Sequence, residues 1–106
     1  MSVLIQTRFA ADTLTAEYSN GNTQTVRLDK FTAHNTDSSA QLLTVHLVPS
    51  GDVPSAANMQ MEKSVPANDT WLCPEMVGQD LDNGDSIYVK AATASKVSIR
   101  CNGRLV

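Results

Sequence analysis

Residues 30–50 read KFTAHNTDSSAQLLTVHLVPS, which is two apolar segments with a polar turn between them. The second segment alternates strictly, with Leu43, Val45 and Leu47 on one parity and Thr44 and His46 on the other. Alternation with a period of two is typical of a β-strand that rests one face on a core. The stretch therefore predicts a β-hairpin that buries the leucines and the valine and leaves His46 on the outer face, as a surface or interface histidine.

Similar short segments, rich in β-branched and aromatic residues, recur along the chain between turn residues such as Asn-Gly. A change of apolar phase at Asp29-Lys30 predicts a bulge, and residues 75–81 would allow one helical turn. We expect an all-β fold, a single antiparallel β-sandwich of about seven to nine short strands that is jelly-roll-like or immunoglobulin-like (Ig-like).

The composition sets the limits of this fold. A chain of 106 residues with 42% hydrophobic and 18% charged side chains is expected to form one domain over residues 1–106, with residues 1–12 as a candidate N-terminal arm. No apolar run could cross a membrane, and no secretory leader is recognisable, so we expect no membrane partner. The net charge is −3 and the basic residues are scattered, which disfavours nucleic acid as a partner.

Few residues offer chemistry. His34, His46 and Cys73 could be imagined as a metal site or a Cys-His pair, but the closely spaced Cys and His pairs of zinc sites are absent from the sequence. Residues 80–85 (DLDNGD) bunch three carboxylates, yet the glycine falls at the fifth position of a calcium loop that requires it at the sixth. With no nucleophile, phosphate or dinucleotide motif either, we expect no metal, no cofactor and no enzyme.

Two further pairs of residues leave alternatives open. Cys73 and Cys101 could form a disulfide or present a reactive thiol, but two small buried hydrophobic residues are favoured. Trp71 and Tyr88 are the candidates for an exposed aromatic platform that would bind a glycan, although Trp71 suits a core position equally well.

Five short motifs follow one another from about Thr23 to the C-terminus. They are Phe-Thr-Ala-His-Asn (31–35), Thr-Val-His-Leu-Val-Pro-Ser-Gly (44–51) with Ala-Ala-Asn (56–58), Pro-Ala-Asn-Asp-Thr (66–70), Gly-Asp-Ser-Ile (84–87) and a last strand ending in Asn-Gly (102–103). In this order the chain resembles a family of small β-sandwich proteins encoded among the virion genes of tailed bacteriophages. Residues 1–22 lie outside the pattern.

The resemblance implies a structural protein of the virion, made in the host cytoplasm. We expect a capsid decoration (cement) protein that binds the major capsid protein on the outer head surface and stabilises the shell as a homo-oligomer, with a trimer favoured. A neck or tail adaptor that anchors a fibre is the alternative, and a receptor- or glycan-binding module is a further one.

Two segments are the candidates for protein contact. The first is the apolar segment Val3, Leu4, Ile5 and Phe9, which would be either an arm added to a neighbour's sheet or the first strand of its own sandwich. The second is the Gly- and Pro-containing loop at 49–58, with Pro49, Asp52, Val53 and Pro54.

Overall fold

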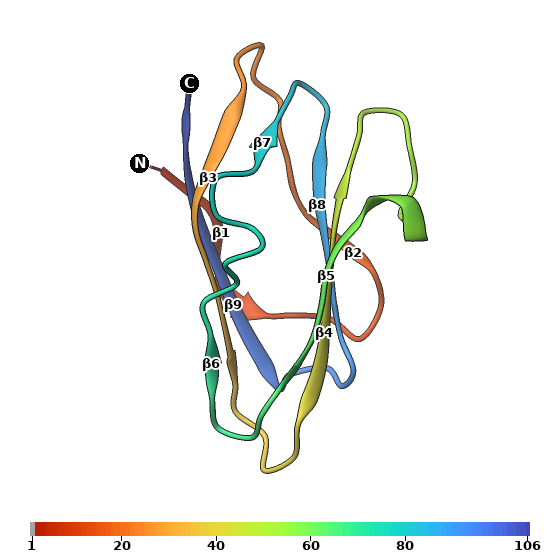
Figure 1. Cartoon of the computed structure of the whole chain (residues 1–106), viewed down its shortest axis with the longest axis vertical. Helices are drawn as coiled ribbons and strands as arrows, with labels where there is room; N and C mark the ends of the chain where they lie inside the picture. Colours follow the sequence, from red (N-terminus) through yellow and green to blue (C-terminus); the bar gives the residue numbers. More distant parts are fainter. Residues whose placement is uncertain (1) are drawn as a thin grey trace.

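Two antiparallel sheets of short strands face each other in the computed structural model, which describes residues 2–106 (Figure 1). One sheet has the order β1-β9-β3-β6, with β7 also paired to β3, and the other has the order β2-β8-β4-β5. The strands are β1 (Ser2–Phe9), β2 (Thr15–Ser19), β3 (Val26–Asn35), β4 (Gln41–Val48), β5 (Met59–Val65), β6 (Thr70–Trp71), β7 (Asp80–Leu81), β8 (Ser86–Ala91) and β9 (Val97–Leu105). The expected β-sandwich is confirmed.

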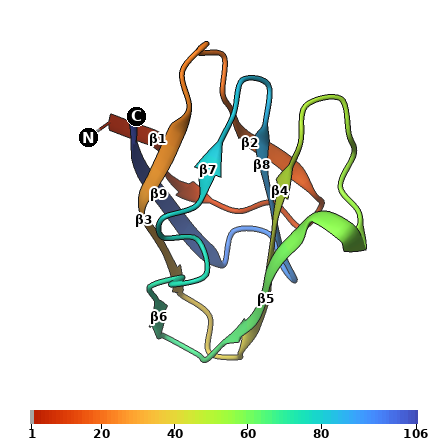
Figure 2. The same cartoon turned by 45° about the horizontal axis from the view of Figure 1, so that its top comes forward.

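The connectivity is that of a jelly roll. Strand β4 pairs with β5, β3 with β6 and β7, β2 with β8, and β1 with β9, so the chain forms one long hairpin whose two arms stay paired. The hairpin then rolls up, because β9 also pairs with β3 and β8 with β4 (Figure 2). This order is the double-sheet jelly roll rather than the immunoglobulin arrangement.

The core lies between the sheets and consists of the inward residues that the alternation predicts. Leu43, Val45, Ile87, Val89 and Ile99 are all fully buried. The bulge expected near Asp29 is present as a register shift between Leu28 and Lys30, and it explains why apolar residues of both phases of β3 are buried.

The N-terminal segment is the first strand of the sandwich. Residues 2–9 pair with β9 through two register shifts. Arg8 crosses to the other sheet, where its guanidinium lies 2.7 Å from the Glu17 carboxylate, whose side chain is only 8% exposed. Of the two roles considered for this segment, the structure therefore shows the strand. Met1 lies outside the described residues.

The helical turn expected at 75–81 is not formed. The segment makes two hydrogen-bonded turns, in which the Met76 and Gln79 amides donate to the carbonyls three residues earlier, and it ends in the short strand β7. Across residues 2–106 no helix has the length and apolar character needed to cross a bilayer.

Candidate interaction surface

Residues of the short sequence motifs form hydrogen bonds with one another. Nδ1 of His46, on β4, and Oδ1 of Asn58 are joined by a hydrogen bond of 2.8 Å. Since this amide oxygen also accepts from the Ser55 amide, Asn58 presents an acceptor and His46 is the donor. His46 is only 3% exposed, so the expectation of a surface histidine is wrong: the loop that follows β4 folds back and covers it.

The other motif residues are paired in the same way. Asn35 is fully buried, and its Nδ2 donates to the carbonyls of Ser39, Val65 and Pro66 at 2.9, 3.0 and 3.3 Å. The Ser50 amide donates to the Asp85 carboxylate, and a side chain on Gly84 would collide with Ser50 Oγ at 2.4 Å. These residue types are therefore explained by loop closure, and none of them is left free for chemistry.

The loop from Pro49 to Asn58 is held at both ends and protrudes between them. Asn58 closes it, because its Nδ2 also donates to the Val53 carbonyl at 2.9 Å. Val53 itself is 72% exposed, the most exposed large hydrophobic residue in the part of the chain that the structure describes. Beside it lies a hollow of about 300 Å³ that is lined by Pro49, Asp52, Val53, Ser55, Ala57 and Asn58.

The structure does not bring the two predicted contact segments together. Pro49, Asp52 and Val53 are exposed on the β4–β5 loop, with Pro54 half-buried beside them. The first segment lies on β1, at the edge of the opposite sheet (Figure 1). Val3 and Phe9 are exposed there and Leu4 is half-buried, but Ile5 is fully buried in the core. The prediction that Ile5 contacts a partner is therefore wrong.

A second hollow, of about 270 Å³, lies beside the start of β1 and the end of β9. Its lining includes Val3, Leu4, Tyr18, Gly103 and Leu105. Gly103 is required at this place, since a Cβ there would lie 2.6 Å from the Arg27 carbonyl and 2.7 Å from Leu4 Cδ1. The strands can pack this closely only around a glycine.

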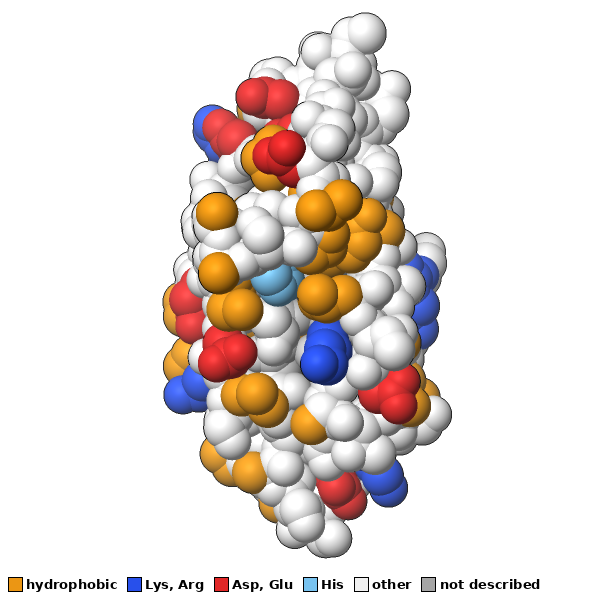
Figure 3. Space-filling view, turned by 90° about the vertical axis from the view of Figure 1, so that its right-hand side faces the viewer, with side chains coloured by type: hydrophobic (Ala, Val, Ile, Leu, Met, Phe, Trp, Pro, Cys, Tyr) orange, Lys and Arg blue, Asp and Glu red, His pale blue; other side chains and the backbone are white. Residues whose placement is uncertain are grey.

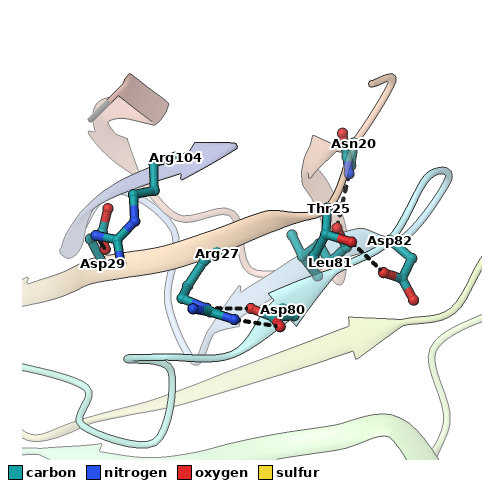
Figure 4. Close-up of polar contacts among 8 residues, drawn as sticks. All are labelled: Asn20, Thr25, Arg27, Asp29, Asp80, Leu81, Asp82 and Arg104. Atoms are coloured by element: carbon teal, nitrogen blue, oxygen red, sulfur yellow. Dashed lines mark hydrogen bonds and ion pairs between the residues drawn. The ribbon is translucent and has the colours of Figure 1, made fainter. Parts of the chain in front are cut away.

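The outer face of the five-stranded sheet is charged. Arg27 of β3 holds the Asp80 carboxylate with two bonds of 2.8 and 3.1 Å, and Arg104 of β9 holds Asp29 at 2.6 Å (Figure 4). The bond between Arg27 and Asp80 lowers the pKa of that carboxyl and raises the pKa of the guanidinium. Charges paired across strands are typical of a solvated face.

The outer face of the four-stranded sheet is different in character. Figure 3 shows hydrophobic side chains gathered across its middle, with a histidine among them. Leu42 and Met59 are exposed by 44% and 37%, and Tyr88 is half-buried between them and β2. The alternation pattern does not predict that this face is apolar, because its apolar residues occur one at a time, at positions that alternate with the core residues and are expected to be polar.

The residues considered for metal or catalytic chemistry lie apart. His34 is on the five-stranded sheet, 2.8 Å from Thr70 Oγ1, while His46 is on the other sheet. Among residues 2–106 no three His, Cys, Asp or Glu side chains are placed to share a metal ion. In the turn at 82–85, the Asp85 carboxylate accepts hydrogen bonds from the Asp82 and Ser50 amides, so it stabilises the turn.

Trp71 does not form an open platform. The Lys63 ammonium lies 4.1 Å from its ring centroid, its Nε1 donates to Glu75, and the ring packs against the core. Lys63 thus points inward on the edge strand β5, a placement that protects an edge against pairing with another chain. Tyr88 lies on the opposite sheet, so the two aromatic residues do not share a surface.

Both cysteines are free and fully buried. Burial raises the pKa of each thiol to about 12, and for Cys73 the nearby Glu75 carboxylate adds to the shift. They are small core residues, as the sequence favoured.

Comparisons with known proteins give no further assignment. No protein-family model matches the chain, and neither curated proteins nor solved structures match it.

Proposed function

We propose that this protein is a structural component of a tailed-phage virion, and that it binds its partner through the β4–β5 loop. The observation that carries this proposal is the loop itself, which exposes Val53 at its tip. Asn58 ties the loop to the sheet by one hydrogen bond, with His46, and braces it internally by two more, with the Ser55 amide and the Val53 carbonyl. A loop that is already ordered loses little conformational entropy on binding, and an exposed apolar side chain offers surface that the partner can bury.

The family resemblance agrees with this location. Two of the matching segments, residues 44–51 and 56–58, flank the exposed tip at residues 52–55 and contribute both partners of the His46–Asn58 bond. A hydrogen-bonded frame around an exposed tip is what a binding loop requires. Jelly rolls serve many functions, so the fold is compatible with a virion role but does not by itself indicate one.

The partner we propose is the major capsid protein on the outer head surface. Many copies bound across the lattice would stabilise the shell by mass action, because each binds the assembled form and not its separate subunits. The role is non-catalytic and needs no cofactor. The scattered basic residues and the net charge of −3 favour protein over nucleic acid as the partner.

The experiment is cryo-electron microscopy of virions made with and without the gene for this chain, together with a heat-stability assay. We expect density for the jelly roll on the head in hundreds of copies, and earlier genome release when it is absent. A dozen or fewer copies at the neck or tail would replace decoration by a connector role. Complete absence from the particle would refute a virion role altogether.

A further inference from the structure

The register of the four-stranded sheet places two opposite charges on either side of Thr44. Thr44 pairs with Glu62 of β5 on one side and with Lys90 of β8 on the other. All three lie on the outer face, because the residues next to them in sequence, such as Val45 and Val89, are buried in the core. Glu62 and Lys90 are both exposed, and within residues 2–106 neither has an ion-pair partner.

The neighbouring row repeats this arrangement with apolar groups. His46 pairs with Met59 of β5 and with Tyr88 of β8. Met59 and Glu62 therefore lie on one line, Tyr88 and Lys90 on a parallel line, and β4 between them carries the exposed Leu42. With neighbouring strands about 4.8 Å apart, the two lines are separated by about 10 Å.

We infer that two copies of this chain pair face to face through the outer surface of this sheet, about a two-fold axis parallel to β4. Such an axis exchanges the two lines. It places Glu62 of each copy opposite Lys90 of the second copy, Met59 opposite Tyr88, and Leu42 opposite its own equivalent. The surface is thus self-complementary, which is the property an isologous interface requires.

The chemistry of the facing groups favours this partner. Two ion pairs form where each separate copy has two unpaired charges, and two methionine–aromatic contacts lie beside them. An axis placed between β4 and β8 instead would set Lys90 against Thr44 and leave Glu62 without a cation. Charge complementarity therefore selects the axis along β4.

The size of the face limits the area that pairing can bury. The whole molecule extends 42 by 19 Å in the view of Figure 3, which is an upper bound for the face, and this axis superposes three of the four strands. The buried area is at most about 600 Å² per partner, the low end for a specific interface. We expect a weak dimer, with a dissociation constant on the order of micromolar, in which the Pro49–Asn58 loops, which cover His46 on the same face, border the contact in both copies.

Charge reversal tests this inference by sedimentation velocity across a concentration series. We expect the wild-type chain to dimerise, and Glu62→Lys and Lys90→Glu each to weaken self-association at least tenfold by placing like charges opposite each other. An equimolar mixture of the two variants should dimerise again, because each then offers the other two opposite-charge pairs. Lys30→Glu, the same change on the opposite sheet, is the matched control.

Three results would overturn the inference: a monomeric or trimeric wild-type chain, single reversals that leave dimerisation intact, or a mixture that stays monomeric. Circular dichroism checks that each variant is folded. If one of them is not, Leu42→Arg places two like charges on the axis and should abolish the dimer. Virion binding is measured separately, with Val53→Asp on purified heads, so that failure of the dimer and failure of the proposed function can be told apart.

Discussion

His46 Nδ1 and Asn58 Oδ1 lie 2.8 Å apart, and this hydrogen bond fixes the far end of the β4–β5 loop to the middle of a sheet. Replacing the Asn58 side chain by alanine would leave the Val53 carbonyl, the Ser55 amide and the His46 ring without their partner. We expect Asn58→Ala to lower the free energy of unfolding by about 2–3 kcal/mol, since buried polar groups become unsatisfied. Urea denaturation measures the change.

Gln60→Ala is the matched control for Asn58→Ala, because residue 60 is an exposed neighbour on β5. It should change stability by less than about 0.5 kcal/mol. Equal stability of the two variants would show that the loop is not held by Asn58.

Asn35 provides a sharper test, because its amide nitrogen faces three carbonyl oxygens. Asn35→Asp replaces that donor by a carboxyl oxygen in a fully buried position. The carboxyl group must either carry an unpaired charge there or take up a proton. We expect a loss of about 3–5 kcal/mol, as for a buried unpaired charge, by thermal or denaturant unfolding. Asn68→Asp, the same change at an exposed position, should be nearly neutral, and equal losses at both sites would contradict the account.

The two thiols make stability depend on alkaline pH. Their pKa is near 9.0 in the unfolded chain and about 12 in the folded protein, so only the unfolded chain releases these protons between those values. Unfolding therefore becomes easier as pH rises above 9.0, by about 1.4 kcal/mol per pH unit for each thiol. The raised pKa of Tyr18 acts in the same direction.

Urea titrations at several alkaline pH values measure this slope, and the double variant Cys73→Ala, Cys101→Ala should flatten it. At pH 8 a thiol reagent should modify the wild-type protein only as it unfolds. Rapid labelling of the native protein would show that the thiols are accessible.

Trp71 should act as a packing residue rather than a carbohydrate platform, since Lys63 covers one ring face and the core meets the ring as well. We expect Trp71→Ala to destabilise the fold by about 2 kcal/mol and Trp71→Phe by less. A glycan array with the folded Trp71→Phe variant should match the wild-type chain. Loss of a glycan signal with unchanged stability would restore the glycan-binding alternative.

The sequence predicts the core well because strand alternation is a local property. Leu43, Val45, Ile87 and Ile99 are buried as expected, and the bulge near Asp29 follows from the same pattern. What alternation cannot foresee is a loop that folds over the outer face of its own sheet. His46 has polar parity and is nevertheless covered, because Asn58, twelve residues later, returns to bond it.

The candidate surface is predictable only in part, for the same reason. Loop composition indicates Pro49 and Val53, which are exposed. It cannot indicate that Glu62 and Lys90 flank Thr44, because they lie on either side of β4 only once both neighbouring strands are in register. The sequence does not predict the burial of Ile5, because its neighbours Leu4 and Gln6 give no clear alternation and the register shifts of β1 turn it inward.

Binding to purified heads that lack this protein tests directly whether the β4–β5 loop attaches the chain to the capsid. The wild-type chain should bind them saturably, in hundreds of copies per particle, and Gln60→Asp should bind equally well. Val53→Asp, folded to the same extent, should bind at least tenfold more weakly, because it places a charge at the tip of the β4–β5 loop. Equal binding of Val53→Asp and the wild-type chain, or no binding of the wild-type chain, would contradict the account.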